Sequence, residues 1–306
     1  MNLAIGFFDG VHLGHQKILA CADAALTFIE HPLAVLAPEK APALLMAPEE
    51  RLAAIAAALK GDKGVNGLKD LGRVRALPFT RELAAESPES FANDLRRDYP
   101  DLETVFCGPN WNFGAGGAGN ADFLRARGFA VETIPFEQHE GAPVSSTRIR
   151  AALKSGDLPL ANAMFGRPFA VCGEVMQGKG EGRKIGFPTL NVKPFNPCLA
   201  GLLPFGVYAV DTTWGRGVAN WGIAPTMGEQ AWTEPVLEVH LLEGEGFERF
   251  EGFEGFERFE KFERFEKFER FEVFLLRFLR PERRFESIEA LRKQIASDVF
   301  SASLSP

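Results

Sequence analysis

The chain has 306 residues and is longer than most single domains, so we expect two compact domains. Its formal charge of -7, without a cluster of lysine or arginine, argues against a nucleic-acid-binding surface. The four cysteines have no paired spacing, which argues against a disulfide framework or a zinc ribbon. The unpaired cysteines favour the reduced cytoplasm, and without a run of about 18 apolar residues that could span a membrane we expect a soluble protein.

Short apolar runs alternate with helix-like segments in the first half of the chain. This alternation predicts a parallel α/β sheet. The expected strands include LAIG (3–6), TVFCG (104–108) and AVETIPF (130–136), and the expected helices are HQKILACADAAL (15–26), APEERLAAIAAALK (47–60), SPESFANDLRRDY (87–99) and ADFLRARG (121–128). We expect this first domain to comprise residues 1–165.

The second half, residues 166–306, consists of short β-rich runs separated by glycine and proline. This pattern predicts a small antiparallel barrel. The expected strands are FAVCGEVMQG (169–178), GVYAVDTTW (206–214), GVANWGIAP (217–225), PVLEVHLLE (235–243) and EVFLLRFLR (272–280), and ESIEALRKQIASD (286–298) is expected to form a closing helix.

A low-complexity segment at residues 247–272 repeats Phe-Glu-X, where X is Arg, Lys or Gly. Three residues advance a helix by about 300°, so the phenylalanines share no single face. Each of several glutamates precedes a basic residue by four positions, as Glu254 precedes Arg258, and this spacing favours a helix. We interpret the segment as a tandem expansion without a catalytic role. The alternative is an aromatic arm that packs on a partner or mediates self-association.

His12 and His15 lie at the start of an expected helix that follows the strand LAIG and the turn FDG. A spacing of three places both side chains on one face. A metal would need further ligands, and His31, His139 and His240 lie in no such pattern. The other alternative is that His12 and His15 are two ordinary helix residues that bind no ligand. Because a helix start at the carboxyl edge of a parallel sheet attracts anions, two imidazole donors there favour a phosphate site.

The segment GFFDGVHLGHQ resembles the His-x-Gly-His signature of nucleotidylyltransferases, in the form found in bacterial bifunctional riboflavin kinase/FAD synthetases. Other segments resemble that family in the same order. They are TFIEHP (27–32), CGPNWNFGAGGAGN (107–120), VSSTRIRAALKSGDLPLANAMFGRPF (144–169), GKGEGRKIGFPTLNV (178–192), GVYAV (206–210) and VLEVHLLE (236–243). Together they cover nearly the whole chain outside the repeat.

The resemblance implies an α/β fold: a nucleotidylyltransferase-type, Rossmann-like parallel sheet domain, then a small antiparallel β-barrel riboflavin kinase domain with a C-terminal helix. It also implies two reactions. The first domain would transfer AMP from ATP to FMN, giving FAD and pyrophosphate. The second would phosphorylate riboflavin to FMN. The implied partners are ATP, riboflavin and FMN, with Mg²⁺ accompanying ATP, and neither nucleic acid nor membrane is expected.

In the first domain, the resemblance makes His12 and His15 catalytic donors to the ATP phosphates. Ser145 or Ser146 can cap the helix that follows. Without the resemblance, this stretch would indicate only a capped surface helix. Arg148 at the start of that helix indicates a bound anion. The ligand-binding residues implied by the resemblance are Gly6, Phe8, Asp9, Gly14, His31, Asn110, Ser146, Thr147 and Arg150; alone, Asn110 would indicate only a turn.

In the second domain, the glycine-rich GKGEGRKIG would allow phosphates to approach the backbone, although a flexible hairpin is the alternative. Riboflavin presents a neutral hydroxyl, so phosphorylation needs a base, and the resemblance assigns Glu238 as catalytic. Alone, Glu238 would indicate a solvated strand face. The nucleotide-binding residues implied are Gly178, Gly180, Gly182, Gly186, Pro188, Thr189 and Asn191, of which Thr189 and Asn191 would also hold Mg²⁺.

Three features depart from the family pattern. Few residues separate His15 from Thr27, so we expect a short or missing second strand and a weakened AMP transfer. Phe7, where the family often has a small or polar residue, is expected to crowd the phosphate loop. The repeat replaces a short turn. These departures leave two other hypotheses beside the bifunctional enzyme: an enzyme with only kinase activity, and an assembly protein that acts through the repeat.

Overall fold

The computed structural model describes residues 1–60, 71–176, 181–223, 234–242 and 270–304. These residues form two compact units, Met1–Arg148 and Ile149–Pro306, with the division inside helix α7 (Ser146–Lys154). Helix α8 (Leu158–Phe165) belongs to the second unit, where the Asn162 side chain donates to Leu275 O and accepts from Phe169 N. The domain boundary expected between residues 165 and 166 stays a prediction.

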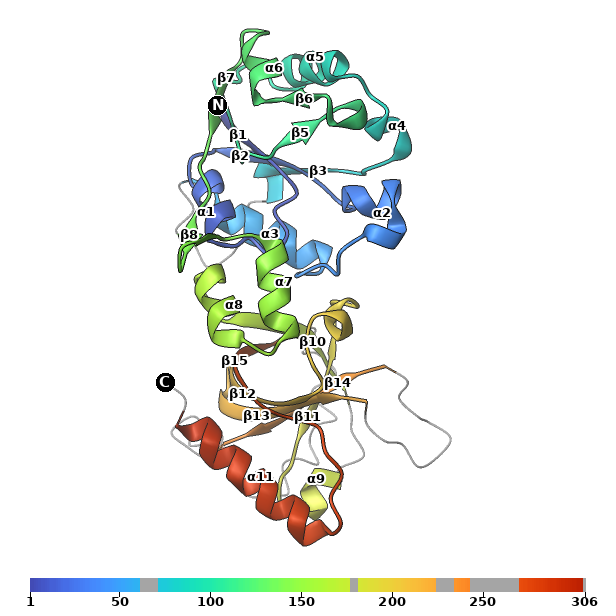
Figure 1. Cartoon of the computed structure of the whole chain (residues 1–306), viewed down its shortest axis with the longest axis vertical. Coiled ribbons are helices and arrows are strands. Elements are labelled where there is room, and N and C mark those ends of the chain that lie inside the picture. Colours follow the sequence, from blue (N-terminus) through green and yellow to red (C-terminus); the bar gives the residue numbers. More distant parts are fainter. Residues whose placement is uncertain (61–70, 177–180, 224–233, 243–269, 305–306) are drawn as a thin grey trace. The chain divides into compact units, whose positions relative to one another are not determined.

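A five-stranded parallel sheet forms the centre of the first unit (Figure 1), with the order β3-β2-β1-β4-β7. Its strands are β1 (Asn2–Ile5), β2 (Ala24–Phe28), β3 (Val74–Leu77), β4 (Thr104–Cys107) and β7 (Ala130–Thr133). The parallel sheet predicted from the sequence is confirmed. The strand order reverses between β1 and β4, and open α/β sheets bind ligands at the carboxyl ends of such a pair.

Helices cover both faces of this sheet, as Figure 1 shows. Leu3 and Ile5 of β1 face α5 (Pro88–Asp98) and α6 (Ala121–Arg125) in one apolar cluster. Ala4, between them, belongs to a second cluster with α1 (Leu13–Leu19) and α3 (Pro48–Ala58). Alternate residues of one strand therefore enter different cores, which gives a three-layer unit.

Shorter elements complete the first unit. Two hairpins pair β5 (Asn112–Phe113) with β6 (Gly119–Asn120) and β8 (Gln138–His139) with β9 (Ala142–Pro143). The short helices are α2 (Pro32–Leu36) and α4 (Arg81–Ala84), and the 3₁₀ turns are Pro38–Lys40, Leu71–Arg73 and Ala115–Gly117.

The second unit is a closed antiparallel barrel with the order β10-β11-β14-β13-β12-β15. The strands are β10 (Phe169–Met176), β11 (Leu190–Pro194), β12 (Gly206–Thr212), β13 (Gly215–Gly222), β14 (Val236–Leu241) and β15 (Phe271–Pro281); helix α9 (Glu181–Lys184) and a 3₁₀ turn (Leu199–Gly201) lie between strands. Leu237, Val239 and Trp221 share one face and are buried, so this face fills the barrel. The predicted barrel is confirmed.

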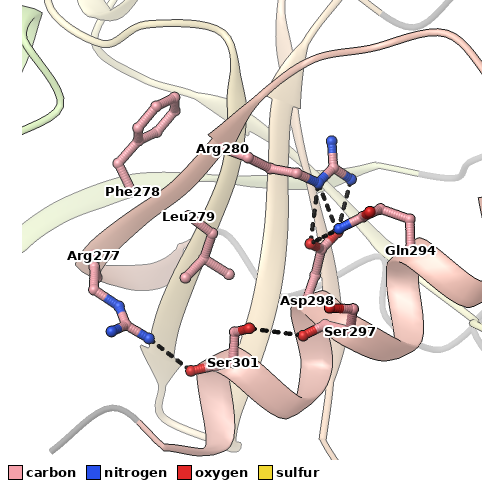
Figure 2. A pocket seen from close by; sticks show the side chains of 8 residues that line it. All are labelled: Arg277, Phe278, Leu279, Arg280, Gln294, Ser297, Asp298 and Ser301. Carbon is pink, nitrogen blue, oxygen red and sulfur yellow. Dashed lines mark hydrogen bonds and ion pairs between the residues drawn. The ribbon is translucent and has the colours of Figure 1, made fainter.

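Helix α11 (Ile288–Ser303) packs on the outside of the barrel through Ala302, which lies against Val207, Ala209 and Val218. A cavity of about 420 Å³ lies between β15 and α11 (Figure 2). The Arg280 guanidinium donates to both oxygens of Asp298, at 2.7 to 3.0 Å. The Gln294 amide also donates to Asp298, and the Arg277 guanidinium donates to the main-chain oxygen of Ser301 at 2.7 Å. Arg280 and Arg277 of β15 therefore both bind α11.

Two local predictions are wrong. The helix expected over residues 15–26 ends at Leu19, and Ala24–Phe28 form β2. Pairing with both β1 and β3 places this segment in the sheet, so the second strand expected to be short or missing is present. The helix expected over 247–272 is wrong at its end, because Phe271 is buried in β15 opposite Gly173. Residues 247–269 of that segment lie outside the described residues.

Within the described ranges, no helix is both long and apolar enough to cross a membrane.

Replacing Asp298 by alanine should destabilise the second unit by about 3 to 5 kcal/mol, because Arg280 would be left without its buried partner. Only 6% of the Asp298 side chain is exposed. The matched control is Glu234→Ala, which removes an exposed ion pair with Lys193 and should cost less than about 1 kcal/mol. Urea unfolding measures both variants, and equal losses would contradict this role for the pair.

Candidate active sites

The first candidate site lies at the switch point of the parallel sheet. The segment from Gly6 to His12 follows β1, and the segment from Gly108 to Asn110 follows its neighbour β4. Parallel strands end at the same edge, so the sheet brings these two segments to one side of the first unit. Asn110 is exposed there, and its main-chain oxygen accepts a hydrogen bond from the Asn112 side chain at 3.2 Å.

His12 and His15 form a stacked pair at the start of α1, with ring centroids 3.6 Å apart and planes inclined by 19°. His12 is the N-cap residue, and its Nδ1 accepts a hydrogen bond from the His15 N–H at 3.4 Å. In a neutral imidazole this bond leaves the proton on Nε2. The pair therefore shares one face, as the spacing predicted, and His12 has an Nε2–H donor.

Gly14 is required by this stacking. A Cβ atom at Gly14 would lie 3.3 Å from Cε1 and 3.4 Å from Nδ1 of the His12 ring. A side chain there would displace the ring that caps the helix. Glycine at the third position of His-x-Gly-His therefore permits the close approach of the first imidazole to the helix backbone.

The His15 ring occupies an apolar environment. Its Nδ1 is buried and has no hydrogen-bond partner among the described residues, and the ring makes an edge contact with Phe8 at 5.4 Å between centroids. Burial, followed by the nearby His12, lowers the pKa of His15 well below its ordinary value of 6.5. His15 is therefore neutral at physiological pH and contributes dipoles rather than a full charge.

Gly6, Phe8 and Asp9 shape the loop before the histidines. Phe8 has a φ of +57° and is buried, and a Cβ at Gly6 would lie 2.9 Å from the end of its ring. The Asp9 carboxylate accepts from Leu45 N at 3.0 and 3.2 Å, and its main-chain oxygen accepts from Ser146 Oγ at 3.1 Å. These contacts give the three predicted residues a structural part in holding the loop.

Ser145, rather than Ser146, caps α7, because its Oγ accepts from Arg148 N at 3.2 Å. The Arg148 guanidinium donates to the main-chain oxygens of His139 and Ala142, at 2.8 and 3.0 Å. Arg148 therefore ties the β8–β9 hairpin to α7, which gives it a structural role at the start of this helix. Its interpretation as a sign of bound phosphate stays a prediction. Thr147 is exposed.

His31 follows β2 and caps α2, with its Nδ1 accepting from Leu33 N at 3.1 Å. Its ring makes an edge contact with Phe7 at 4.8 Å between centroids. Phe7 therefore packs against His31. Arg150 lies on the part of α7 that belongs to the second unit.

The second candidate site is a polar row on the outer face of the barrel. Glu238 of β14 lies directly opposite Asn191 of β11 on one side and Asn220 of β13 on the other. Their neighbours Leu237 and Val239 face the barrel core and are buried. The predicted alternation of Glu238 and His240 against Val239 agrees with this arrangement.

Glu282, which follows β15, adds a second carboxylate to this row. It accepts from the Asn220 side chain at 3.2 Å, and a Cβ on Gly222 would overlap its carboxylate. Burial, followed by the charge of Glu282, raises the pKa of Glu238. A partly buried carboxylate with a raised pKa is a stronger proton acceptor than an ordinary surface glutamate.

The segment from Phe187 to Asn191 leads into this row. The Pro188 main-chain oxygen lies 2.8 Å from Nδ1 of His240, so the two residues are held together. A Cβ at Gly182 would lie 2.2 Å from the Phe187 oxygen and 3.5 Å from Oγ1 of the exposed Thr189, so α9 begins beside this threonine. Gly186 has a φ of +86°. Gly178 and Gly180 lie outside the described residues.

The predicted residues that the structure describes thus fall into two sets. The set with the histidine pair lies in the first unit, except for Arg150, and the set with Glu238 lies in the second unit. Asn220 and Glu282 beside Glu238, and Arg51 behind the first site, were not expected. Asn220 and Glu282 gain their positions from strand pairing across distant segments, which residue spacing along one strand does not reveal.

His15 should make the first unit sensitive to acid. Because its pKa is lower in the folded than in the unfolded state, the unfolded chain binds the proton more tightly. Stability should be fully present above about pH 6.5 and fall as the pH drops below that value. An NMR titration of the His15 ring should give a midpoint well below 6.5, and His15→Gln should remove part of the acid sensitivity in urea unfolding. A midpoint near 6.5 would contradict burial of the neutral ring.

Comparisons with known proteins match the two halves of the chain to two different families. The FAD synthetase family model matches residues 1–148, and the riboflavin kinase family model matches residues 165–304. A crystal structure titled as a macrolide-efflux protein from Streptococcus pneumoniae has a TM-score of 0.72 and 23% identity, and the alignment covers 100% of this chain and 94% of that one. At that identity the likeness concerns the fold alone.

Curated relatives match over most of their length. A bifunctional riboflavin kinase/FMN adenylyltransferase of Pseudomonas fluorescens is 34% identical, over 97% of this chain and 90% of its own. Proteins of the same name are 33% identical in Escherichia coli, over 98% of this chain and 91% of theirs, and 32% identical in Bacillus subtilis, over 79% and 78%. The chain belongs to the bifunctional riboflavin kinase/FMN adenylyltransferase family.

Proposed function

We propose that the first unit transfers AMP from ATP to FMN and that the second unit phosphorylates riboflavin to FMN. The observation that carries this proposal is that each unit matches one of the two family models and contains its own set of polar residues. The substrates are therefore ATP, riboflavin and FMN. FMN made by the second unit is the nucleophile used by the first.

In AMP transfer, an ionised phosphate oxygen of FMN attacks the α-phosphorus of ATP. The bond from that phosphorus to the bridging oxygen breaks, and pyrophosphate leaves with the electron pair. No proton has to be removed from the nucleophile, so the protein contributes positioning and charge stabilisation. The Nε2–H of His12 and the neutral ring of His15 supply donors at the start of α1, where the free N–H groups of the helix also favour anions.

We assign the remaining predicted residues of the first unit to binding the nucleotides. Ser146 and Gly14 lie beside the histidine loop and would hold it against the phosphates. Thr147 and Asn110 would offer side-chain groups to the substrates. Arg150 belongs to the second unit, so its part in binding the triphosphate stays a prediction. His31, on the loop after β2, would contact a substrate at the same sheet edge.

In the kinase reaction, the terminal ribityl hydroxyl of riboflavin attacks the γ-phosphorus of ATP, and ADP leaves. The hydroxyl is neutral, so its proton must pass to a base as the new bond forms. Glu238 is the base we propose, because its raised pKa favours proton acceptance. Asn191 and Asn220 lie on either side of Glu238 in the polar row.

The oxygen donors of the second unit fit Mg²⁺. Thr189 is exposed and Asn191 lies opposite Glu238, so a hydroxyl and an amide oxygen are presented beside a carboxylate. When bound with ATP, the ion would neutralise charge on the phosphates. The glycines at 178, 180, 182 and 186 would let phosphates approach the backbone. ATP use and four free cysteines support a cytoplasmic location.

Two variants separate the proposed sites. His15→Ala should reduce FAD formation by about 10² to 10⁴ while FMN formation from riboflavin continues, because a positioned donor is lost from one site. Glu238→Ala should reduce FMN formation by about 10² to 10⁴ while added FMN is still converted to FAD. Chromatography of the flavins measures both steps. A single variant that abolished both would contradict independent sites, and a wild-type chain that makes FMN but no FAD would favour the kinase-only alternative.

The Phe-Glu-X segment is not needed for this function. A chain from which residues 247–269 are deleted should form FMN and FAD at rates within about threefold of the full chain, since long surface insertions contribute little to a fold. The same deletion tests the alternative of an assembly protein. Loss of self-association in sedimentation, together with loss of both activities, would support that alternative instead.

A further inference from the structure

Arg51 is a fully buried arginine at the back of the first site, on helix α3. Its Nη1 donates to the main-chain oxygen of Phe7 at 2.6 Å and to Oγ1 of Thr27 at 3.2 Å. Its Nη2 donates to the main-chain oxygens of Phe28 at 2.6 Å and Ile29 at 3.0 Å. One guanidinium therefore joins the end of β1 to the end of β2.

The partners of Arg51 are unusual for a buried cation. All four of these hydrogen bonds go to neutral oxygens, and the Asp9 carboxylate, which accepts from Leu45 N, contributes to Arg51 through its charge. Burial lowers the pKa of Arg51 to about 10, which Asp9 partly opposes, so the group stays charged at neutral pH. A buried charge held by neutral oxygens is costly to a fold. Its presence at a ligand-binding edge needs a reason beyond stability.

Phe7 extends the contact toward His31. The Arg51 guanidinium lies 3.9 Å from the Phe7 ring centroid, a cation–π contact. The same ring meets His31 edge-on, with centroids 4.8 Å apart. Phe7 therefore lies between Arg51 and His31, while the expectation that it crowds the phosphate loop stays a prediction.

We infer that Arg51 is a positioning residue for AMP transfer, fixing the loop that carries His12 and His15 relative to the loop that carries His31. The two loops follow neighbouring strands, and the sheet alone fixes only their first residues. The main-chain oxygens of Phe7 and Ile29 lie just beyond the last residues of β1 and β2. The Arg51 guanidinium donates a hydrogen bond to each of them. A misplacement of about 1 Å at such a site can cost about 10² in rate.

This inference rests on the proposed function of the first unit, and its test compares variants with the wild-type chain. Arg51→Met keeps the apolar stem but loses the charge and all four hydrogen bonds. Its kcat for FAD formation should fall about 100-fold, with a smaller change in KM for FMN. Arg51→Lys keeps the charge without the planar fork and should recover part of the loss, to within about 10-fold of wild type.

Arg73→Met is the matched control. Arg73 also binds main-chain oxygens, donating to Asp23 O at 2.7 Å and Lys60 O at 2.6 Å, but Asp23 precedes β2 and lies at the opposite end of that strand. The rate of FAD formation by the Arg73→Met variant should stay within about twofold of wild type at a temperature where the chain is folded. FMN formation by the second unit of the same chain should stay within twofold in every variant.

NMR of histidine side chains gives a readout that does not depend on activity. The chain has five histidines. Arg51→Met and Arg51→Lys should shift the ring signals of His12, His15 and His31, whereas His240 in the barrel should not move. If Arg51→Met does not fold, the histidine signals and the kcat of Arg51→Lys test the inference instead.

Unchanged histidine signals, or a kcat within threefold of wild type in a folded Arg51→Met chain, would overturn the inference. So would an equal loss in Arg73→Met, because that would indicate general destabilisation. If the wild-type chain forms no FAD, the proposed function fails, while the histidine spectra still test whether Arg51 positions the two loops.

Discussion

The pairing of β1 with β2 on one side and β4 on the other determines where the first unit can bind a phosphate. This pairing brings the loop after β1 and the loop after β4 to the same edge of the sheet. The first of these loops leads into α1, so the sheet determines where the start of α1 and the His12 ring that caps it lie.

The barrel depends on a comparable constraint, the register of β14 between β11 and β13. That register sets Glu238 opposite Asn191 and Asn220. A shift by one residue would turn Glu238 into the core and Val239 out to solvent, because alternate residues of a strand face opposite sides. The buried Leu237 and Val239 therefore hold the catalytic candidate in position through the core rather than through polar contacts.

The sequence predicted the two architectures because both have strong local patterns. It also predicted the shared face of His12 and His15, since a spacing of three fixes that geometry. It failed where the deciding contact is distant in the chain. The alanines of β2 indicated helix until pairing with β1 and β3 placed them in the sheet. Arg51, in the first turn of an alanine-rich helix and directly after two glutamates, gave no sign that it would be buried.

Capping shows the same limit at a smaller scale. Either Ser145 or Ser146 could cap α7, and the structure assigns the cap to Ser145 while Ser146 donates to Asp9 O. Arg148 was interpreted as a sign of a bound anion because the sequence pattern did not predict the β8–β9 hairpin, whose main-chain oxygens accept its hydrogen bonds. Phe271 looked like a repeat residue, although barrel closure requires it in β15.

The central claim is that one chain has two separate ATP sites, one in each unit. Calorimetric titration of the full chain with a non-hydrolysable ATP analogue and Mg²⁺ tests it most directly. We predict two equivalents bound per chain. A total of one equivalent, or of none, would contradict the claim.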